Sequence, residues 1–147
     1  MLLAMTKANA ISESNRSSLV IGADQLLLFE GEVMSKAPNM EAARDHLLRF
    51  RGKAHVLEGA VCCVRNGETV WSYSDRATMH VRNFSPEFLG RYLAGAGEKV
   101  LASVGCYQLE GEGVQLFDKI EGDFFTILGL PMLPLLEFLR SDGVLDS

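Results

Sequence analysis

The fold is decided by the stretch LVIGADQ, residues 19–25. Its short, β-branched apolar run predicts a buried strand over residues 19–23, ended by a Gly-Ala turn. The carboxylate of Asp24 then lies at the carboxyl end of a buried strand, where open α/β sheets carry catalytic groups. We therefore interpret Asp24 as the chemical centre, able to hold a divalent cation or to activate water. A turn-capping carboxylate is the alternative, and spacing alone leaves both open.

The composition is that of an ordinary globular protein. The chain has 147 residues, of which 48% are hydrophobic and 22% charged, and this is enough for one domain over residues 1–147 with a buried core. The net charge is −5 and no basic block stands out, so we expect no nucleic-acid polymer as partner, although a single nucleotide remains possible. Apolar runs stay short of a membrane span and the N-terminus lacks signal features. These patterns predict a cytoplasmic protein without a membrane partner.

The three cysteines are Cys62, Cys63 and Cys106. An odd count without CxxC spacing argues against a disulfide framework and against a zinc site. Because Cys62 and Cys63 are neighbours in a predicted strand, they face opposite ways and cannot hold one metal together. We interpret all three as buried structural thiols in a reducing compartment.

Local signals predict an α/β order of elements. Asn39 and Ser85 are predicted N-caps, and Asn66-Gly67 predicts a hairpin turn. The predicted helices cover about residues 1–12, 40–51, 86–94 and 132–140, and the predicted strands about 19–23, 55–64, 69–81 and 114–117. Together they predict an α/β fold with a mixed, twisted central sheet flanked by helices.

Further side chains have two interpretations each. Lys7 and Lys36 suit phosphate contacts as point charges, or they are solvated surface lysines. His55 is interpreted as a satisfied sheet histidine rather than a ligand or base. Four acidic residues near glycines suit either a hard cation or loop solvation: Glu110, Glu112, Glu121 and Asp123.

A set of ordered motifs adds a family resemblance. The motifs are IGADQ (residues 21–25), SKAP (35–38), RGKAH (51–55), GCYQLEG (105–111), IEGDFF (120–125) and GLP (129–131). In this order and spacing the chain resembles the Maf-type nucleoside triphosphate pyrophosphatases, from about Leu3 to Arg140. The resemblance implies a Maf/ITPase-like fold, a homodimer and a house-cleaning enzyme.

The resemblance also implies a reaction and a site. The enzyme would hydrolyse a nucleoside triphosphate between the α and β phosphates, with Mg²⁺ or Mn²⁺, to a monophosphate and pyrophosphate. Asp24 falls on the family's proton acceptor and would contact the metal. Lys7 and Lys36 fall on lysines that neutralise the triphosphate, while Gln25 and Glu110 fall on positions linked to substrate choice.

The residue at position 110 bears on the substrate. Many family members carry glutamine there, whereas the carboxylate of Glu110 can accept hydrogen bonds from a guanine edge and suits the cationic ring of N7-methylated guanine. Together with Gln25 this resembles the subgroup that acts on 7-methyl-GTP. The subgroup acting on dTTP and UTP is the alternative.

The beginning of the chain departs from the family pattern. Family members start with an apolar strand and a Ser-x-x-Arg phosphate loop, and we expect both to be missing here, so that the domain over residues 1–147 is incomplete at its N-terminus. A second hypothesis follows from this departure. The chain would be a catalytically impaired remnant that serves as a binding or regulatory module linked to cell-division arrest.

Overall fold

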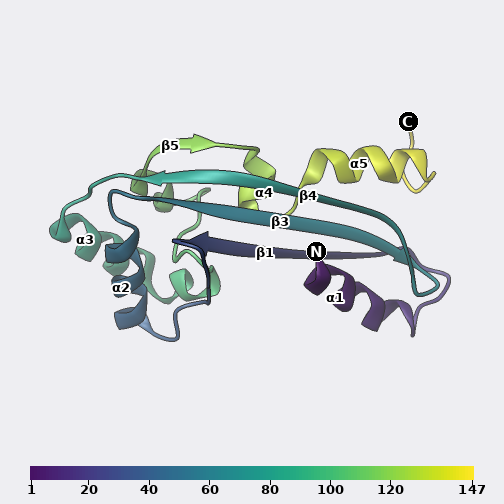
Figure 1. Cartoon of the computed structure of the whole chain (residues 1–147), viewed down its shortest axis with the longest axis horizontal. Helices are drawn as coiled ribbons and strands as arrows, with labels where there is room; N and C mark the ends of the chain where they lie inside the picture. Colours follow the sequence, from purple (N-terminus) through teal and green to yellow (C-terminus); the bar gives the residue numbers. More distant parts are fainter. The chain divides into compact units, whose positions relative to one another are not determined.

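A computed structural model describes residues 1–147 and divides them into two compact units (Figure 1). Unit 1 comprises Met1–Gln25, Glu58–Arg76 and Asp123–Ser147, and unit 2 comprises Leu26–Leu57 and Ala77–Gly122. The elements are α1 (Leu2–Ser12), β1 (Val20–Phe29), β2 (Glu32–Met34), α2 (Met40–Phe50), β3 (Ala54–Arg65), β4 (Glu68–Val81), α3 (Pro86–Ala96), the 3₁₀ helices η1 (Gly97–Ala102) and η2 (Glu112–Leu116), β5 (Phe117–Glu121), α4 (Phe124–Leu128) and α5 (Met132–Ser141). The strands form one five-stranded sheet in the order β2-β1-β3-β4-β5. The predicted α/β fold with a central sheet and flanking helices is confirmed.

In unit 1, small residues bring α1 close to the strands. A Cβ at Gly22 of β1 would collide with the Ala4 carbonyl oxygen of α1, so only glycine permits this approach. Ala4 and Ala8 are buried there against Ala60 and Cys62 of β3. The small side chains thus decide how near α1 comes to β1.

The other face of unit 1 is packed with larger side chains. Cys63 of β3 belongs to a cluster with Leu135 and Leu139 of α5. Trp71 stacks on Phe138, with ring centroids 5.1 Å apart. Since Cys62 lies with α1 and Cys63 with α5, the predicted opposite orientation of the two thiols is confirmed.

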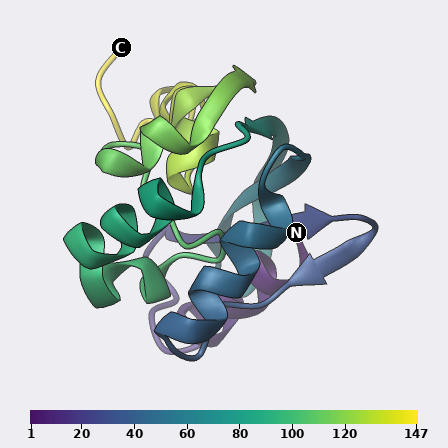
Figure 2. The ribbon, with the colours of Figure 1, turned by 90° about the vertical axis from the view of Figure 1, so that its left-hand side faces the viewer.

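Unit 2 contains a hairpin and a set of packed aromatic rings. Residues Glu30 and Gly31, both with positive φ, turn the chain between β1 and β2, which pair antiparallel with Leu27 opposite Met34. Figure 2 shows this hairpin as two blue arrows joined by a turn. Phe29 of β1 and Phe50 of α2 pack edge to face, with ring centroids 4.9 Å apart.

The predicted caps and the hairpin turn are confirmed. The Asn39 side chain accepts from the Ala42 amide at 2.9 Å, and the Ser85 hydroxyl accepts from the Phe88 amide at 3.1 Å. Asn66 and Gly67 have φ of 53° and 77° between β3 and β4, as a two-residue hairpin of type I′ requires.

Two predicted elements differ from those in the structure. The strand over residues 19–23 does not end in a Gly-Ala turn, because β1 runs unbroken from Val20 to Phe29; Gly22 serves the approach of α1 instead. The strand predicted over residues 114–117 is misplaced, since η2 occupies Glu112–Leu116 and β5 begins only at Phe117. Within η2, Gly113 lies so close to the Gln108 carbonyl oxygen that a Cβ would come within 2.6 Å of it, so only glycine permits this packing.

Candidate functional site

The predicted centre is occupied by an ion pair between α1 and β1. Lys7 Nζ lies 2.7 Å from Asp24 Oδ1, a charge-assisted hydrogen bond, and 3.5 Å from the Ala23 carbonyl oxygen. The Lys7 side chain is 59% exposed and that of Asp24 17% exposed. The carboxylate is therefore sheltered but reachable from solvent, and much of the Lys7 side chain is exposed to water.

The position of this pair follows from strand alternation. Successive side chains of a strand point to opposite faces, so Gly22 and Asp24 share the face on which α1 lies. Because Gly22 lets α1 approach, Lys7 can reach the carboxylate. The prediction that Asp24 ends a strand is wrong, since it lies inside β1. The Asp24 carboxylate is accessible because it lies on the face of β1 that carries α1.

Gln25 faces the other way and is bound to α4. Its Nε2 donates to the carbonyl oxygens of Thr126 and Ile127, each at 2.9 Å. The Thr126 hydroxyl donates to Asp75 Oδ2 at 3.0 Å, and the Thr126 amide donates to Asp123 Oδ2 at 3.0 Å. Sequence reasoning missed Asp75 and Thr126. Asp123 three residues before Thr126 is a helix N-cap pattern that could have indicated α4.

Lys36 and Glu110 belong to unit 2. Lys36 is exposed two residues after β2, and Glu110 is exposed in the loop before η2. Of the five predicted site residues, the structure therefore brings Lys7 and Asp24 into contact, attaches Gln25 to α4 and presents Lys36 and Glu110 to solvent within unit 2.

Two of the four acidic residues near glycines have structural partners. Glu121 lies 2.8 Å from Lys119 Nζ and 2.9 Å from His80 Nε2, and these hydrogen bonds lower its pKa to about 2. Asp123 caps α4. No group of three or more His, Cys, Asp or Glu gathers as a metal cage. The structure thus gives Glu121 and Asp123 roles in ion pairing and helix capping, and the four residues form no cation cage of their own.

His55 is part of the core of unit 2. It is 2% exposed, and its Nε2 lies 2.7 Å from the Tyr107 hydroxyl oxygen, whereas Nδ1 has no hydrogen-bond partner. Burial lowers the pKa of His55 to about 4, which keeps the ring neutral at pH 7. The interpretation as a structural sheet histidine is confirmed, with only one of its two nitrogens satisfied.

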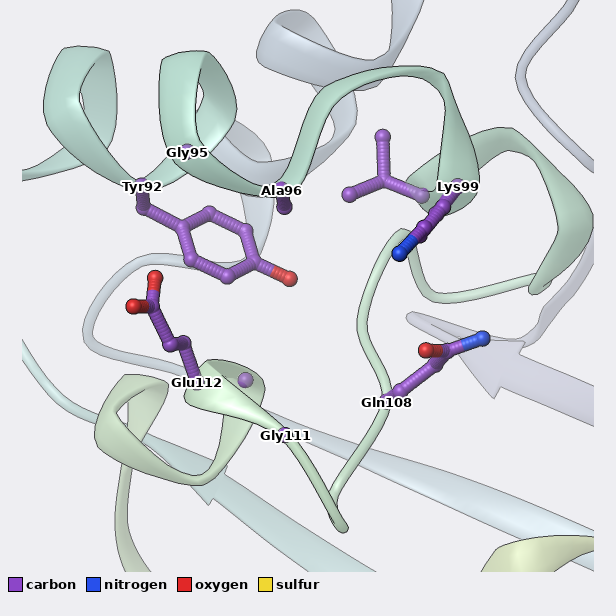
Figure 3. A pocket seen from close by; sticks show the side chains of 9 residues that line it. Tyr92, Gly95, Ala96, Lys99, Gln108, Gly111 and Glu112 are labelled. Carbon is purple, nitrogen blue, oxygen red and sulfur yellow. The ribbon is translucent and has the colours of Figure 1, made fainter.

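A cavity of about 160 Å³ lies in unit 2 between α3, η1 and the loop before η2 (Figure 3). Lys99, Gln108 and Glu112 point toward it, next to the ring of Tyr92. Burial raises the pKa of Tyr92 to about 12, and its hydroxyl donates to the Cys106 carbonyl oxygen at 2.9 Å. The Tyr92 hydroxyl is thus a structural donor, and the cavity carries one cation and one anion.

All three cysteines are free and buried. Burial raises the pKa of Cys63 and of Cys106 to about 11 in each case. The thiolate is the nucleophilic form of cysteine, and a raised pKa disfavours it at these two residues. The prediction that all three thiols are buried is confirmed. No helix has both the length and the apolar character that crossing a membrane requires.

The chain belongs to the Maf-like protein family, whose pattern it matches over residues 1–142. It is 54% identical to a nucleoside triphosphate pyrophosphatase of Granulibacter bethesdensis, over 97% of this chain and 73% of that protein. It is 51% identical to a 7-methyl-GTP pyrophosphatase of Mesorhizobium japonicum, over 100% of this chain and 74% of that protein. It is also 48% identical to a 7-methyl-GTP pyrophosphatase of Brucella suis, over 99% of this chain and 73% of that protein.

Proposed function

We propose that this chain is a nucleoside triphosphate pyrophosphatase that converts its substrate to the monophosphate and pyrophosphate. The observation that carries the proposal is the Lys7–Asp24 pair, in which a carboxylate that solvent can reach lies beside an exposed ammonium group. Relatives named as such pyrophosphatases are 54% and 51% identical to this chain over nearly its whole length. We favour 7-methyl-GTP as substrate, with dTTP or UTP as the alternative.

Asp24 is proposed as the general base. A triphosphate offers Lys7 a more highly charged partner than the carboxylate does, so the ammonium moves to the substrate. Asp24 Oδ1 is then free to accept a proton from the attacking water. Lys36, exposed in unit 2, is proposed as a second cation that neutralises charge on the triphosphate.

A divalent cation, Mg²⁺ or Mn²⁺, is proposed as cofactor. Mg²⁺ is commonly bound by one or two carboxylates together with substrate phosphates and water, without a cage of protein ligands. The chain fits this mode, because Lys7 uses only Oδ1 of Asp24 and leaves Oδ2 as a ligand. When bound there, the metal supplies charge neutralisation and polarisation of a phosphoryl oxygen.

Glu110 is proposed to favour the methylated base. Its exposed carboxylate can accept from the guanine N–H edge and attract the positive charge of the N7-methylated ring. Glu110→Gln should then lower kcat/KM for 7-methyl-GTP relative to UTP. An unchanged ratio of the two values would contradict this role.

The proposed activity is tested by pyrophosphate release from 7-methyl-GTP, UTP and dTTP with Mg²⁺. We expect turnover that a chelator abolishes and that Asp24→Asn removes. Fastest turnover of dTTP or UTP would favour the alternative substrates. If no nucleotide is turned over in an Asp24-dependent way, the hypothesis of a non-catalytic binding module replaces the enzyme.

We also propose a cytoplasmic location and a homodimer. Support for the location comes from three free, buried thiols, which are typical of reducing compartments. The homodimer rests on the family resemblance. Sedimentation equilibrium would test it directly, since a monomer mass at all concentrations contradicts it.

A further inference from the structure

The first half of β4 forms an open edge of the sheet. β5 pairs with β4 only over Thr78–Val81, at the arrowhead end of the strand (Figure 1). Residues 68–76 of β4 therefore have β3 on one side and no strand on the other. Most of their side chains are exposed, including Val70 at 44% and Tyr73 at 37%. Such an edge presents unpaired backbone groups and is a template for another strand.

Backbone hydrogen bonds at the end of β4 indicate which residues point to this edge. The Val81 amide donates to the Lys53 carbonyl oxygen, just before β3, and the Arg82 amide donates to the Leu116 carbonyl oxygen, just before β5. Successive residues of a strand direct their N–H and C=O groups to opposite neighbours, so even-numbered residues of β4 direct theirs to the β5 side. The even-numbered residues at the centre of the open half are Val70, Ser72 and Ser74.

The charges of the open edge are arranged symmetrically about Ser72. Glu68 lies four positions before it and Arg76 four positions after it. When two copies of the strand pair antiparallel about a two-fold axis at Ser72, Glu68 of each copy lies opposite Arg76 of the other, and other registers bring neither pair together. The ion pairs within the chain leave Glu68 free. Arg76 uses one nitrogen on Glu58 and keeps further N–H donors.

The aromatic side chains of the edge fit the same register. The rings of Trp71 and Tyr73 are nearly parallel, with 6.2 Å between centroids, and Trp71 also stacks on Phe138 of α5. In the register centred on Ser72, Trp71 lies opposite Tyr73 of the second copy and on the same face, where aromatic pairs across strands are stabilising. An open hollow of about 540 Å³ beside these rings leaves room for the side chains of the second copy.

We propose that two copies of this chain pair through residues 68–76 of β4, antiparallel about Ser72, so that their five-stranded sheets form one continuous sheet. The inference rests on the homodimer proposed above and assigns its interface. Pairing satisfies the N–H and C=O groups of the open edge, and the two Glu68–Arg76 contacts fix the register. Because a two-fold contact uses the same surface of both copies, the edge is then closed to further strands.

The register is tested by trapping the pair with a disulfide. Ser72→Cys places a thiol opposite its own copy, at a Cα separation of about 5.5 Å, which a disulfide can span. Ser74→Cys is the matched control, because it makes the same exchange at an exposed position of the same strand face while its own copy lies about 14 Å away. The native thiols are buried and contribute little background.

With diamide as the oxidant, we expect Ser72→Cys to form a covalent dimer at least about tenfold faster than Ser74→Cys, because only the first pair has disulfide geometry. Electrophoresis without reductant measures both rates. Equal rates, or a Ser72→Cys chain that stays monomeric on the gel, would overturn the proposed register.

The charge contacts are tested by reversing one sign. Glu68→Arg places like charges opposite each other at both ends of the interface. Relative to the parent chain at the same salt, we expect its dimer dissociation constant to rise about tenfold in about 50 mM NaCl and less than about threefold in about 1 M NaCl, because salt screens exposed charges. Glu32→Arg makes the same change at an exposed position of β2 and should leave the constant unchanged. A Glu68→Arg chain that dimerises like the parent at low salt would overturn the Glu68–Arg76 contacts.

The mass of the parent chain separates failure of this interface from failure of the homodimer. If sedimentation equilibrium gives a monomer at all concentrations, the homodimer proposal fails and the interface fails with it. If the parent chain is a dimer but Ser72→Cys is trapped no faster than Ser74→Cys, the homodimer stands and only the β4 interface is overturned. None of these measurements uses nucleotide turnover, so the proposed activity is tested separately.

Discussion

The two units contain polar pairs of equal length and opposite character. In unit 1, Lys7 Nζ and Asp24 Oδ1 are 2.7 Å apart. In unit 2, His55 Nε2 and the Tyr107 hydroxyl oxygen are also 2.7 Å apart. Lys7 is 59% exposed at its side chain, whereas His55 and Tyr107 are 2% and 7% exposed. The two pairs have the same distance between their polar atoms and differ in how far solvent reaches them.

Solvent decides which pair can do chemistry. Burial lowers the pKa of His55 to about 4 and raises that of Tyr107, because charge is costly in a core. Both groups are neutral at pH 7 and hold the fold together. Lys7 keeps access to water, and in the proposed mechanism it exchanges Asp24 for the substrate. A short polar contact therefore indicates a reactive site only where solvent or substrate can reach it.

Replacing the carboxylate of the open pair should have the largest effect. Asp24→Asn keeps the shape but removes the base, and we expect kcat to fall by about 10³-fold, about 4 kcal/mol in activation free energy. Asp118→Asn, at an exposed position of β5, is the matched control. Steady-state pyrophosphate release measures both, and an Asp24→Asn variant with a tenth of the parent rate would show that Asp24 is not the base.

Acidification should lower the stability of the fold through the buried His55–Tyr107 pair. The pKa of His55 is about 4 in the folded chain and about 6.5 in the unfolded chain. Between these two pH values the unfolded chain binds a proton that the folded chain does not. The stability contributed by neutral His55 is therefore complete above pH 6.5 and is lost as the pH falls toward 4. This amounts to about 2 kcal/mol between pH 7 and pH 5. Urea unfolding at both pH values measures it, and His55→Phe should remove this part of the pH dependence.

Removing the Tyr107 hydroxyl of the buried pair should lower the free energy of unfolding by slightly less than acidification does. Tyr107→Phe leaves His55 Nε2 without a partner inside the core, and we expect the free energy of unfolding to fall by about 1–2 kcal/mol. The same exchange at Tyr73, which is 37% exposed, should change it by less than about 0.5 kcal/mol. Equal effects at both positions would contradict the structural role of the His55–Tyr107 contact.

The smallest effect should come from the cation of the open pair. Lys7→Met removes an exposed ion pair, and such pairs contribute little because water and salt screen them. We expect the free energy of unfolding to change by less than about 0.5 kcal/mol in denaturant titrations. A loss above 2 kcal/mol would mean that Lys7 is a structural residue, and the contrast between the two pairs would then fail.

Local chemistry could be predicted where neighbours along the chain supply it. The caps at Asn39 and Ser85 and the turn at Asn66-Gly67 depend on residues within three positions, so sequence reasoning found them. It misread Gly22, because glycine serves turns and close packing equally well. Only the position of α1 shows that Gly22 makes room for a helix.

The candidate site was predicted only in part, because some of its contacts join residues that are far apart in the sequence. The motif around Asp24 and the family resemblance pointed to Asp24 and Lys7, which the structure joins. The partners of Gln25 lie more than 100 residues further along the chain. Asp75 and Thr126 belong to no motif that was recognised, so their convergence could not be anticipated.

The sequence by itself determined the family, most of the long helices and strands and the carboxylate at the centre of the proposed site, because these depend on residue type and local spacing. Only the tertiary structure decided that Asp24 and Gln25 face opposite sides of an unbroken β1, with one bound to α1 and the other to α4. Strand alternation separates neighbours, and burial sets the charge state of each group. Both depend on which distant elements pack against the strand.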